Sequence, residues 1–247
     1  MNPINIQDDY RLLSPASECS YLPSETSVMD YRIILALNSN EYEHLLERGW
    51  RRQGVHVFRP ACPACNKCRS LRVNVAEFRP SKSQRRVLRQ NQDVQLIVQR
   101  PVITYQHIEV FNRYHQDMSQ RRGWRFRQVD PQEYYQSFLS GDYDFAREFL
   151  YLRDGQLLGV GLVDVTDNAM SSVYFFHDPA WRNDSPGTFS ALKELEFAAA
   201  RNIPFVYLGY WIRENQSMQY KNRFRPHELL DEYGSDHANP NWKSPEV

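Results

Sequence analysis

The sequence predicts an α+β fold in two parts, a cysteine-bearing N-terminal α/β domain over residues 1–100 and a mixed-sheet domain over residues 101–247. Three observations support this prediction. The first part holds three cysteines within seven residues and a long basic stretch. The second part reads as consecutive strands followed by a helix and a buried strand, a pattern typical of α+β folds. A chain of 247 residues is also long enough for one large domain or two small ones with real cores.

The composition is typical of a globular protein in a reducing compartment. Hydrophobic residues make up 41% of the chain and charged residues 24%, which argues against a disordered protein. The N-terminus lacks the pattern of a secretory signal, and no window reaches the roughly 18 apolar residues of a membrane helix. Four cysteines without such a signal are more often metal ligands or reduced thiols than disulfides. We therefore expect a cytoplasmic protein with no membrane partner.

Local patterns place the elements of the first part. Extended segments are expected at residues 10–22 and 28–37. Asn38 followed by Glu41 can cap a helix at 39–48, and Ser81 can cap a second helix at 82–90. Further strands are expected on either side of the cysteine run and after the second helix, at 55–59, 71–75 and 94–99.

The second part begins with helices and continues with strands. The expected helices are 105–119 and 132–140, joined by a basic and aromatic loop at 120–131. The later elements are strands 148–153, 156–166 and 171–177, a loop at 178–186, a helix at 187–201 and a buried strand at 204–208. This is the order of elements in the core of acyltransferases of the acetyltransferase (GNAT) type, although other α+β folds share such runs.

The loop at 182–187 occupies the place where acetyltransferases hold the pyrophosphate of coenzyme A. Ser185 stands where those enzymes have glycine, Pro186 removes a backbone amide, and Asp184 adds a negative charge. We therefore expect no coenzyme A. The helix N-terminus at Gly187 can still polarise an acyl oxygen.

The cysteines form the first candidate site. Cys62, Cys65 and Cys68 recur every third residue in a turn-rich segment, and nearby basic residues favour the thiolate form. With Cys19 as a fourth ligand they can hold zinc or an iron–sulfur cluster, and the spacing does not distinguish the two. The alternative is that all four are reduced thiols that pack in the protein interior.

A basic helix forms the second candidate site. Residues 48–100 contain 13 Lys and Arg against two acidic residues, a net charge of +11 that the rest of the chain cancels. Four of these cations share one face of the helix at 82–90. They are Lys82, Arg85, Arg86 and Arg89. No acidic residue lies nearby to pair with them, so a surface for phosphates, such as those of structured RNA, is favoured over a merely solvated face.

Two further groups of residues can bind substrates. Arg51 and Arg52 beside Trp50 can hold a carboxylate or phosphate with paired hydrogen bonds, or can form an ion pair between the two parts of the chain. The end of the last buried strand is rich in aromatic residues and precedes a lysine. Tyr207, Trp211 and Lys221 can therefore line a pocket, or the aromatic residues can simply pack in the core.

Several long motifs resemble one family, the bacterial aspartate/glutamate leucyltransferases, which are similar to the eukaryotic arginyl-tRNA–protein transferases. The motifs are GWRRQG, FRPACPACNKCRSLRV, FRPSKSQRRVLRQN, VYFFHDPAWRNDSPGTFSALKELEFA and VYLGYWIRENQSMQYKNRFRPHELL. They run in order from Tyr21 to about Leu230. The departures are His177 before Asp178-Pro179, and Pro186 in place of the leucine that is more usual in that loop.

The resemblance implies transfer of an amino acid, leucine in the bacterial enzymes, from its tRNA to the α-amine of proteins that begin with Asp or Glu. The product would enter N-degron turnover. It also implies a domain like that of aminoacyl-tRNA-dependent peptide ligases, and it places the cysteines at positions implicated in zinc or iron–sulfur binding in the eukaryotic relatives. The basic helix suits tRNA, and Arg51 or Arg52 suits the side-chain carboxylate of the acceptor.

Direct attack of the acceptor amine on the tRNA ester needs no covalent enzyme intermediate. Asp178 is the candidate for removing the proton, and Tyr210 or Tyr220 for donating to the oxyanion or to a ribose oxygen. Three other functions remain as alternatives: arginine transfer to the same acceptors, a metal-dependent RNA-binding module without catalysis, and an acetyltransferase that uses coenzyme A. The unfavourable loop at 182–187 already argues against the last.

Overall fold

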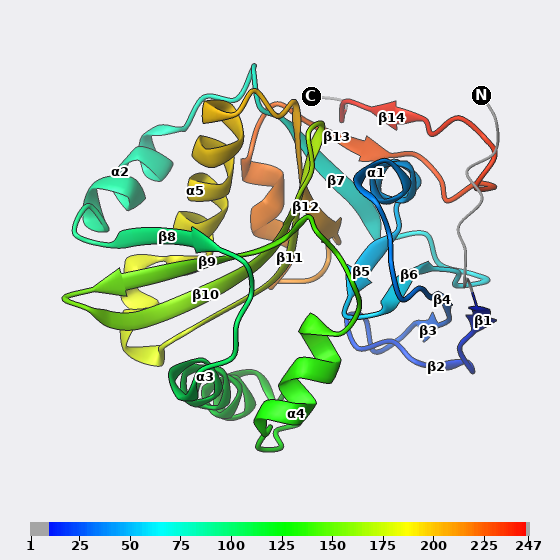
Figure 1. The fold of residues 1–247 in the computed structure, drawn as a ribbon. Helices are drawn as coiled ribbons and strands as arrows, with labels where there is room; N and C mark the ends of the chain where they lie inside the picture. The colour runs from blue at the N-terminus through cyan, green and yellow to red at the C-terminus, as the bar shows by residue number, and fades with distance from the viewer. Residues whose placement is uncertain (1–9, 246–247) are drawn as a thin grey trace.

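The computed structural model describes residues 10–245, and a sheet of eight strands forms its centre. The strand order is β14-β13-β7-β12-β11-β10-β9-β8. In chain order the strands are β7 (Arg69–Asn74), β8 (Gln95–Gln99), β9 (Ala146–Arg153), β10 (Gln156–Val165), β11 (Ala169–His177), β12 (Phe205–Trp211), β13 (His227–Leu230) and β14 (Trp242–Lys243). β11 and β12 pair in parallel and the other neighbours are antiparallel, so the sheet is mixed, as expected (Figure 1).

The expected boundary at residue 100 does not coincide with a boundary between sheets. β7 and β8 come from the first 100 residues, yet β7 lies between β12 and β13, and β8 pairs with β9. The local patterns located both strands well but carried no information on their partners, because strand pairing depends on residues far away in the chain.

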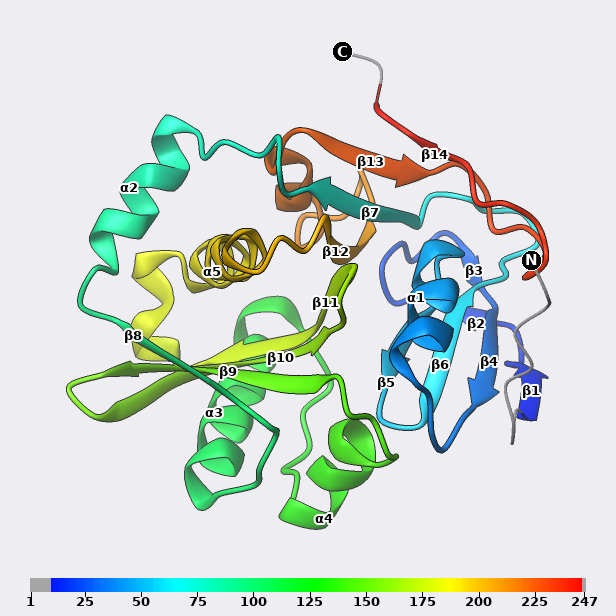
Figure 2. The same ribbon diagram turned by 45° about the horizontal axis from the view of Figure 1, so that its top comes forward.

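Helices cover both faces of this sheet. α5 (Pro186–Ala200) packs on one face, with α2 (Lys82–Gln90) outside it. α3 (Tyr105–Arg122) and α4 (Pro131–Tyr134), which continues as the π-helical turn η1 (Tyr135–Leu139), cover the other face (Figure 2). Within the described residues, no helix is both long and apolar enough to cross a bilayer.

Helix ends follow the local sequence closely. Asn38 and Ser81 each form a capping box at the start of α1 (Ser39–Glu47) and α2, as the sequence predicts. α3 runs three residues further than expected, to Arg122. It stops at Gly123, whose φ of 68° lies in the left-handed region that favours glycine.

A second, four-stranded sheet is built from the N-terminal segment. Its order is β1-β4-β6-β5, with a small β2-β3 hairpin beside it. These strands are β1 (Tyr10–Leu13), β2 (Ser17–Glu18), β3 (Thr26–Ser27), β4 (Met29–Ile33), β5 (Arg51–Gln53) and β6 (His56–Pro60). α1 and the buried Trp50 pack on one face of it, around Val57 of β6.

The segment between β13 and β14 returns to this N-terminal sheet. Asp236 accepts a hydrogen bond of 2.8 Å from the indole of Trp50 and forms ion pairs with Arg59 at 3.1 Å and Arg32 at 3.4 Å. The guanidinium of Arg59 also lies over the Trp50 ring, 4.3 Å from its centre. Part of the basic stretch is therefore buried and neutralised within the fold and does not contribute to a charged surface.

Candidate active site

One cavity brings together residues from both parts of the chain. It has a volume of about 640 Å³ and lies where β5, the end of α3, β11, the start of α5, β12 and the short 3-10 helix η3 (Gln219–Arg223) meet. Three of these elements contribute buried charged side chains, which are Arg51 and Arg52 of β5, Glu194 of α5 and Lys221 of η3. Buried ionisable groups in a cavity are typical of active sites.

A β-bulge in β12 positions two of these cations. The register between β12 and β7 shifts between Tyr207 and Gly209, and Gly209 has a φ of 87°, which favours glycine. The Tyr207 carbonyl accepts a hydrogen bond from Arg51 at 3.5 Å, and the Tyr210 carbonyl accepts one from Lys221 at 2.8 Å. A Cβ at position 209 would lie 3.4 Å from both cationic groups, which is an ordinary contact, so the positive φ rather than a lack of space favours glycine here.

Glu194 is the acidic member of the site. It accepts hydrogen bonds from the hydroxyl groups of Ser172 and Ser190. Burial raises the pKa of Glu194 to about 7, although its hydrogen bonds and the neighbouring cations oppose the rise. Burial and then the charge of Arg51 lower the pKa of Lys221 to about 7. Both groups can therefore exchange protons near neutral pH, as acid–base catalysis requires.

The adjacent arginines Arg51 and Arg52 point to opposite faces of β5. Both contribute to the lining of the cavity, but their guanidinium groups have different partners. Arg52 forms paired hydrogen bonds with the buried carboxylate of Asp164 in β10, one of them 3.0 Å long, and its guanidinium lies 4.4 Å from the centre of the Tyr143 ring. Arg52 thus makes the ion pair between the two parts of the chain that the sequence left open. Only Arg51 keeps the expected position for a substrate carboxylate.

Both tyrosines selected from the sequence line the cavity, but in different ways. The hydroxyl of Tyr210 lies 3.2 Å from the Gly49 carbonyl and 3.1 Å from the Phe58 carbonyl, so its proton is held by the backbone. Burial also raises its pKa far above the ordinary value. Tyr220 packs edge-on against Phe224 and has no hydroxyl partner among residues 10–245. Tyr220 is therefore better placed than Tyr210 to donate to a bound group.

Three of the residues selected for catalysis or for the aminoacyl pocket do not line the cavity. Asp178 begins the 3-10 helix η2 (Pro179–Asp184), where its carboxylate caps the helix and pairs with Arg113 at 2.8 Å. The Tyr207 hydroxyl accepts a hydrogen bond of 3.2 Å from Arg72, and Trp211 packs in the core of the eight-stranded sheet. Asp178 is therefore not placed to act as the base, and Tyr207 and Trp211 do not form walls of the pocket as the sequence predicted. Of that pocket group, only Lys221 lines the cavity.

An aromatic and basic wall closes one side of the cavity. Tyr114, Arg121 and Arg122 of α3 line it together with Trp124, which follows the helix. The Tyr114 and Trp124 rings meet edge-to-face with their centres 6.3 Å apart. Residues 120–131 were expected only to form a basic and aromatic connecting loop, because nothing local shows which surface they face.

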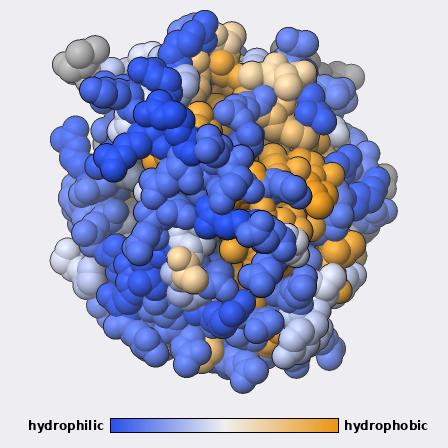
Figure 3. All heavy atoms as spheres, turned by 90° about the vertical axis from the view of Figure 1, so that its left-hand side faces the viewer, coloured by the Kyte–Doolittle hydropathy of each residue, from blue (hydrophilic) through white to orange (hydrophobic). Residues whose placement is uncertain are grey.

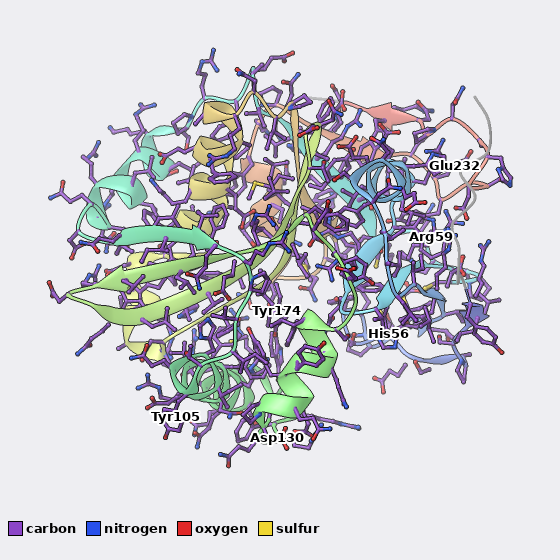
Figure 4. The ribbon with its side chains drawn as sticks, viewed as in Figure 1. His56, Arg59, Tyr105, Asp130, Tyr174 and Glu232 are labelled. Carbon is purple, nitrogen blue, oxygen red and sulfur yellow. The ribbon has the colours of Figure 1, made fainter. Side chains whose placement is uncertain are left out.

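Next to this wall, a tyrosine of β11 is held by a half-buried histidine. The hydroxyl of Tyr174, which is labelled in Figure 4, lies 2.8 Å from Nε2 of His115. Nδ1 of His115 lies 2.8 Å from the Phe111 carbonyl. Burial lowers the pKa of His115, so the ring is neutral, with Nδ1 donating to the carbonyl and Nε2 accepting from the tyrosine. The sequence did not point to the His115–Tyr174 pair, because the two residues are far apart in the chain. It did not point to Glu194 either, because a glutamate within a helix is usually solvated.

The N-terminus of α5 also faces the cavity. Ser185, Pro186, Gly187 and Thr188 line it, and Pro186 occupies the first turn, where a missing amide matters least. The positive end of the helix dipole therefore points toward bound groups that carry or develop negative charge.

The basic helix α2 lies outside the cavity. Its four cations, Lys82, Arg85, Arg86 and Arg89, are all exposed. The side of the molecule to which α2 belongs is mostly hydrophilic, with one apolar area (Figure 3). The end of α2 is joined to η2 by a hydrogen bond of 2.9 Å from Gln90 to Asp184, and η2 leads into the cavity wall at Ser185.

The cysteines line a neighbouring cavity of about 350 Å³. Cys19, Cys62, Cys65 and Cys68 all contribute to it, and it shares Tyr210 with the main cavity. Burial, and then the neighbouring thiols, raises the pKa of Cys68 to about 12. In the part of the chain that the structure describes, no three Cys, His, Asp or Glu side chains are arranged to hold an ion. The thiols thus converge without ligand geometry, and metal or cluster binding stays a prediction.

Known proteins resemble this chain in sequence over most of its length. Residues 17–86 match the family described as "Arginine-tRNA-protein transferase, N terminus", and residues 106–231 match its C-terminal counterpart. An aspartate/glutamate leucyltransferase of Helicobacter hepaticus is 38% identical over 91% of this chain and 93% of its own. The Aeromonas hydrophila protein of the same name is 36% identical over 88% of this chain and 90% of its own.

A solved structure supports the fold. The crystal structure of FemX matches 92% of this chain and 87% of its own with a TM-score of 0.52 and 9% sequence identity, so the likeness concerns the fold alone. The sequence matches decide the family, because they cover both parts of the chain at more than 30% identity. The chain belongs to the arginine-tRNA-protein transferase family, together with the bacterial aspartate/glutamate leucyltransferases.

Proposed function

We propose that the protein is an aminoacyltransferase that moves leucine from leucyl-tRNA to the N-terminal α-amine of proteins beginning with Asp or Glu. One observation carries the proposal: a single cavity holds a buried arginine, a carboxyl group and an amine that exchange protons near pH 7, and a wall of aromatic and arginine side chains. The names of the curated relatives support leucine as donor and Asp or Glu as acceptor. The reaction belongs to the cytoplasm, where charged tRNA is made, and its product would be directed to N-degron turnover.

The aromatic and basic wall is the proposed site of the 3′ end of the tRNA. Unpaired bases stack on aromatic rings such as Trp124 and Tyr114, and Arg121 and Arg122 can bind the adjoining phosphates. The exposed cations of α2 are the proposed contact for phosphates further along the tRNA. η2 lies between α2 and the cavity wall, so a tRNA bound to α2 could follow η2 to the active site.

Arg51 is the proposed partner of the acceptor's side-chain carboxylate. It is 7% exposed, and its two hydrogen bonds to backbone carbonyls leave further N–H donors of the guanidinium for a ligand. A buried guanidinium that binds a carboxylate with charge-assisted bonds discriminates strongly against acceptors that lack the carboxylate.

The proposed chemistry is aminolysis of the tRNA ester. The acceptor nitrogen attacks the ester carbonyl, and Glu194 takes the proton that the amine loses. The tetrahedral intermediate then expels the ribose oxygen, which receives the proton back. Protonated Lys221 and the N-terminus of α5 stabilise the oxyanion, and such preorganised groups contribute on the order of several kcal/mol. Atoms and charge balance without a cofactor, and no coenzyme A is needed.

Zinc or iron–sulfur binding by the four cysteines is a separate proposal and carries no step of this reaction. Its support is that all four thiols line one cavity and that three of them recur every third residue. The bound group would hold the N-terminal hairpin against β12 beside Tyr210. Metal analysis and the visible absorption spectrum of protein purified without oxygen test the proposal. A metal content well below one ion per chain, with no visible absorption, would contradict it.

A transfer assay tests the proposed function. Peptides that begin with Asp, Glu, Lys or Ala are mixed with tRNA charged with radiolabelled leucine or arginine. Label from leucyl-tRNA on the Asp and Glu peptides alone is the expected result. Label from arginyl-tRNA would change the donor and keep the mechanism. Binding of tRNA without any transfer would favour an RNA-binding module.

A further inference from the structure

The four-stranded N-terminal sheet has one covered face and one open face. Along β4 the residues alternate between half-buried and buried, and β6 continues this alternation. The buried set, which includes Val57, packs against α1 and Trp50. The opposite set lines a groove of about 580 Å³ whose far wall is the π-helical turn η1.

The open face leads directly to the cavity arginine. Strand register places Leu12 beside Tyr31, Tyr31 beside Phe58, and Phe58 beside Arg51. These four side chains form one row across the sheet, from its outer edge to the active site. The groove and the active-site cavity share the lining residues Phe58 and Gln53, so the two spaces adjoin.

The row has the chemistry of a peptide-binding surface. The Tyr31 ring lies 5.9 Å from that of Phe58 and 6.4 Å from that of His56, so the aromatic lining is already assembled (Figure 4 labels His56). None of the eight described residues that line the groove is Asp, Glu, Lys or Arg. Such a surface favours apolar and aromatic side chains and gives a charged ligand no partner.

We propose that this groove binds the acceptor polypeptide downstream of its N-terminal residue, roughly residues 2–5. The inference rests on the proposed function, in which the first residue of the acceptor enters the cavity at Arg51. Because the acceptor is a protein, its chain must leave the cavity, and the groove adjoins the cavity at Phe58, the strand neighbour of Arg51. Three strand spacings of about 4.8 Å give a row about 14 Å long. Four extended residues at about 3.3–3.6 Å each cover that length.

The proposal gives the enzyme a second level of selectivity. Arg51 would recognise the first side chain, and the groove would favour acceptors with apolar residues immediately after it. Charged tRNA approaches from the other end of the cavity, at the wall formed by α3, so the two substrates do not compete for space.

Acceptors of different length and composition test the proposal. The first acceptor is an Asp-Gly amide, which is too short for the groove. The other two are eight-residue peptides that begin with Asp and carry either apolar residues or Gly and Ser at positions 2–5. We expect kcat/KM for the apolar peptide to exceed that of the other two by about tenfold or more, which corresponds to burial of one or two side chains.

Tyr31→Ala should remove most of this advantage while leaving kcat/KM for the Asp-Gly amide within about twofold of the unaltered enzyme. The matched control is Tyr105→Ala, the same change at an exposed residue of α3, which should leave all three acceptors unaffected (Figure 4). Equal use of all three acceptors by the unaltered enzyme would overturn the proposal. So would an equal loss on all three in Tyr31→Ala. Failure of the unaltered enzyme with every acceptor would instead overturn the proposed function.

Crosslinking supplies a measurement that does not depend on a variant's folding. An acceptor with a photoreactive benzoyl-phenylalanine at position 3 should label Tyr31, Phe58 or His56. Excess Asp-Gly amide should reduce the labelling, because the two compete for the cavity. Labelling confined to α3 or to a second copy of the chain would overturn the proposal.

Discussion

Replacement of Glu194 by glutamine should lower activity and raise stability at the same time. Glutamine keeps the shape of the side chain and can still accept a hydrogen bond from Ser172 or Ser190, but it cannot take a proton from the acceptor amine. Loss of a general base typically costs about 10²–10⁴ in rate. We therefore expect kcat to fall by at least about a hundredfold at pH 7.5.

The stability change follows from the pKa of Glu194, which burial raises from 4.5 to about 7. The folded protein keeps the Glu194 carboxyl protonated up to a higher pH than the unfolded chain does. Relative to high pH, this carboxyl therefore contributes its full stabilisation below about pH 4.5, and the stabilisation is lost as the pH rises toward 7. The shift corresponds to at most about 3 kcal/mol above pH 7. Glutamine avoids this loss, so Tm should rise by up to about 6–12 °C at pH 8 and stay unchanged near pH 4.5.

Two measurements check this prediction. Initial transfer rates between pH 5.5 and 9 should pass through a maximum near pH 7 in the unaltered enzyme, because Glu194 must have lost its proton and Lys221 must have kept its own. In Glu194→Gln the rise at low pH that Glu194 causes should be absent, while the fall caused by Lys221 should remain. Thermal unfolding at pH 5 and pH 8 gives the stability change. The matched control is Glu196→Gln, on an exposed part of the same helix, which should change neither quantity. An unaltered pH–rate profile in Glu194→Gln, or a lower Tm at pH 8, would refute the reasoning.

Three other substitutions separate binding, recognition and stability. Arg51→Lys should raise KM for Asp-starting peptides about tenfold or more, because lysine cannot form paired bonds, while the Kd for charged tRNA in filter binding stays the same. Arg86→Ala should weaken tRNA binding and reduce the slope of log K against log salt by about 1, and a salt-independent loss would remove α2 from the tRNA contact. Asp164→Ala should cost about 3–5 kcal/mol in denaturant unfolding, because it leaves the Arg52 guanidinium buried without its partner. A cost below about 1 kcal/mol would show that water reaches Arg52.

Features encoded by neighbouring residues were predictable from the sequence. The capping boxes at Asn38 and Ser81 fixed the starts of α1 and α2, because the capping side chain and the amide that it satisfies are three residues apart. The arginine and lysine of the site were also selected, since their positions beside aromatic motifs are unusual. β5 was missed because three residues are too few to show the alternation of apolar and polar side chains that marks a strand. Only their pairing with β6 makes them a strand.

Features encoded by distant residues were not predictable in this way. The bulge at Gly209 decides which side chains of β12 face the cavity, and it exists only in register with β7. Without that register, Tyr207 and Trp211 look as suitable for a pocket as Tyr210. Glu194 likewise becomes a candidate base only when Ser172 of β11 and Lys221 of η3 are packed around it.

The position of β7 has a consequence for synthesis of the protein. β7 ends at residue 74, but the strands on both its sides begin at residues 205 and 227. During translation the ribosome must add more than half of the chain before either edge of β7 gains its neighbour. Such long-range pairings form slowly, and an unpaired apolar strand is prone to pair with other chains. The nascent protein is therefore expected to depend on chaperones until residue 230 has emerged.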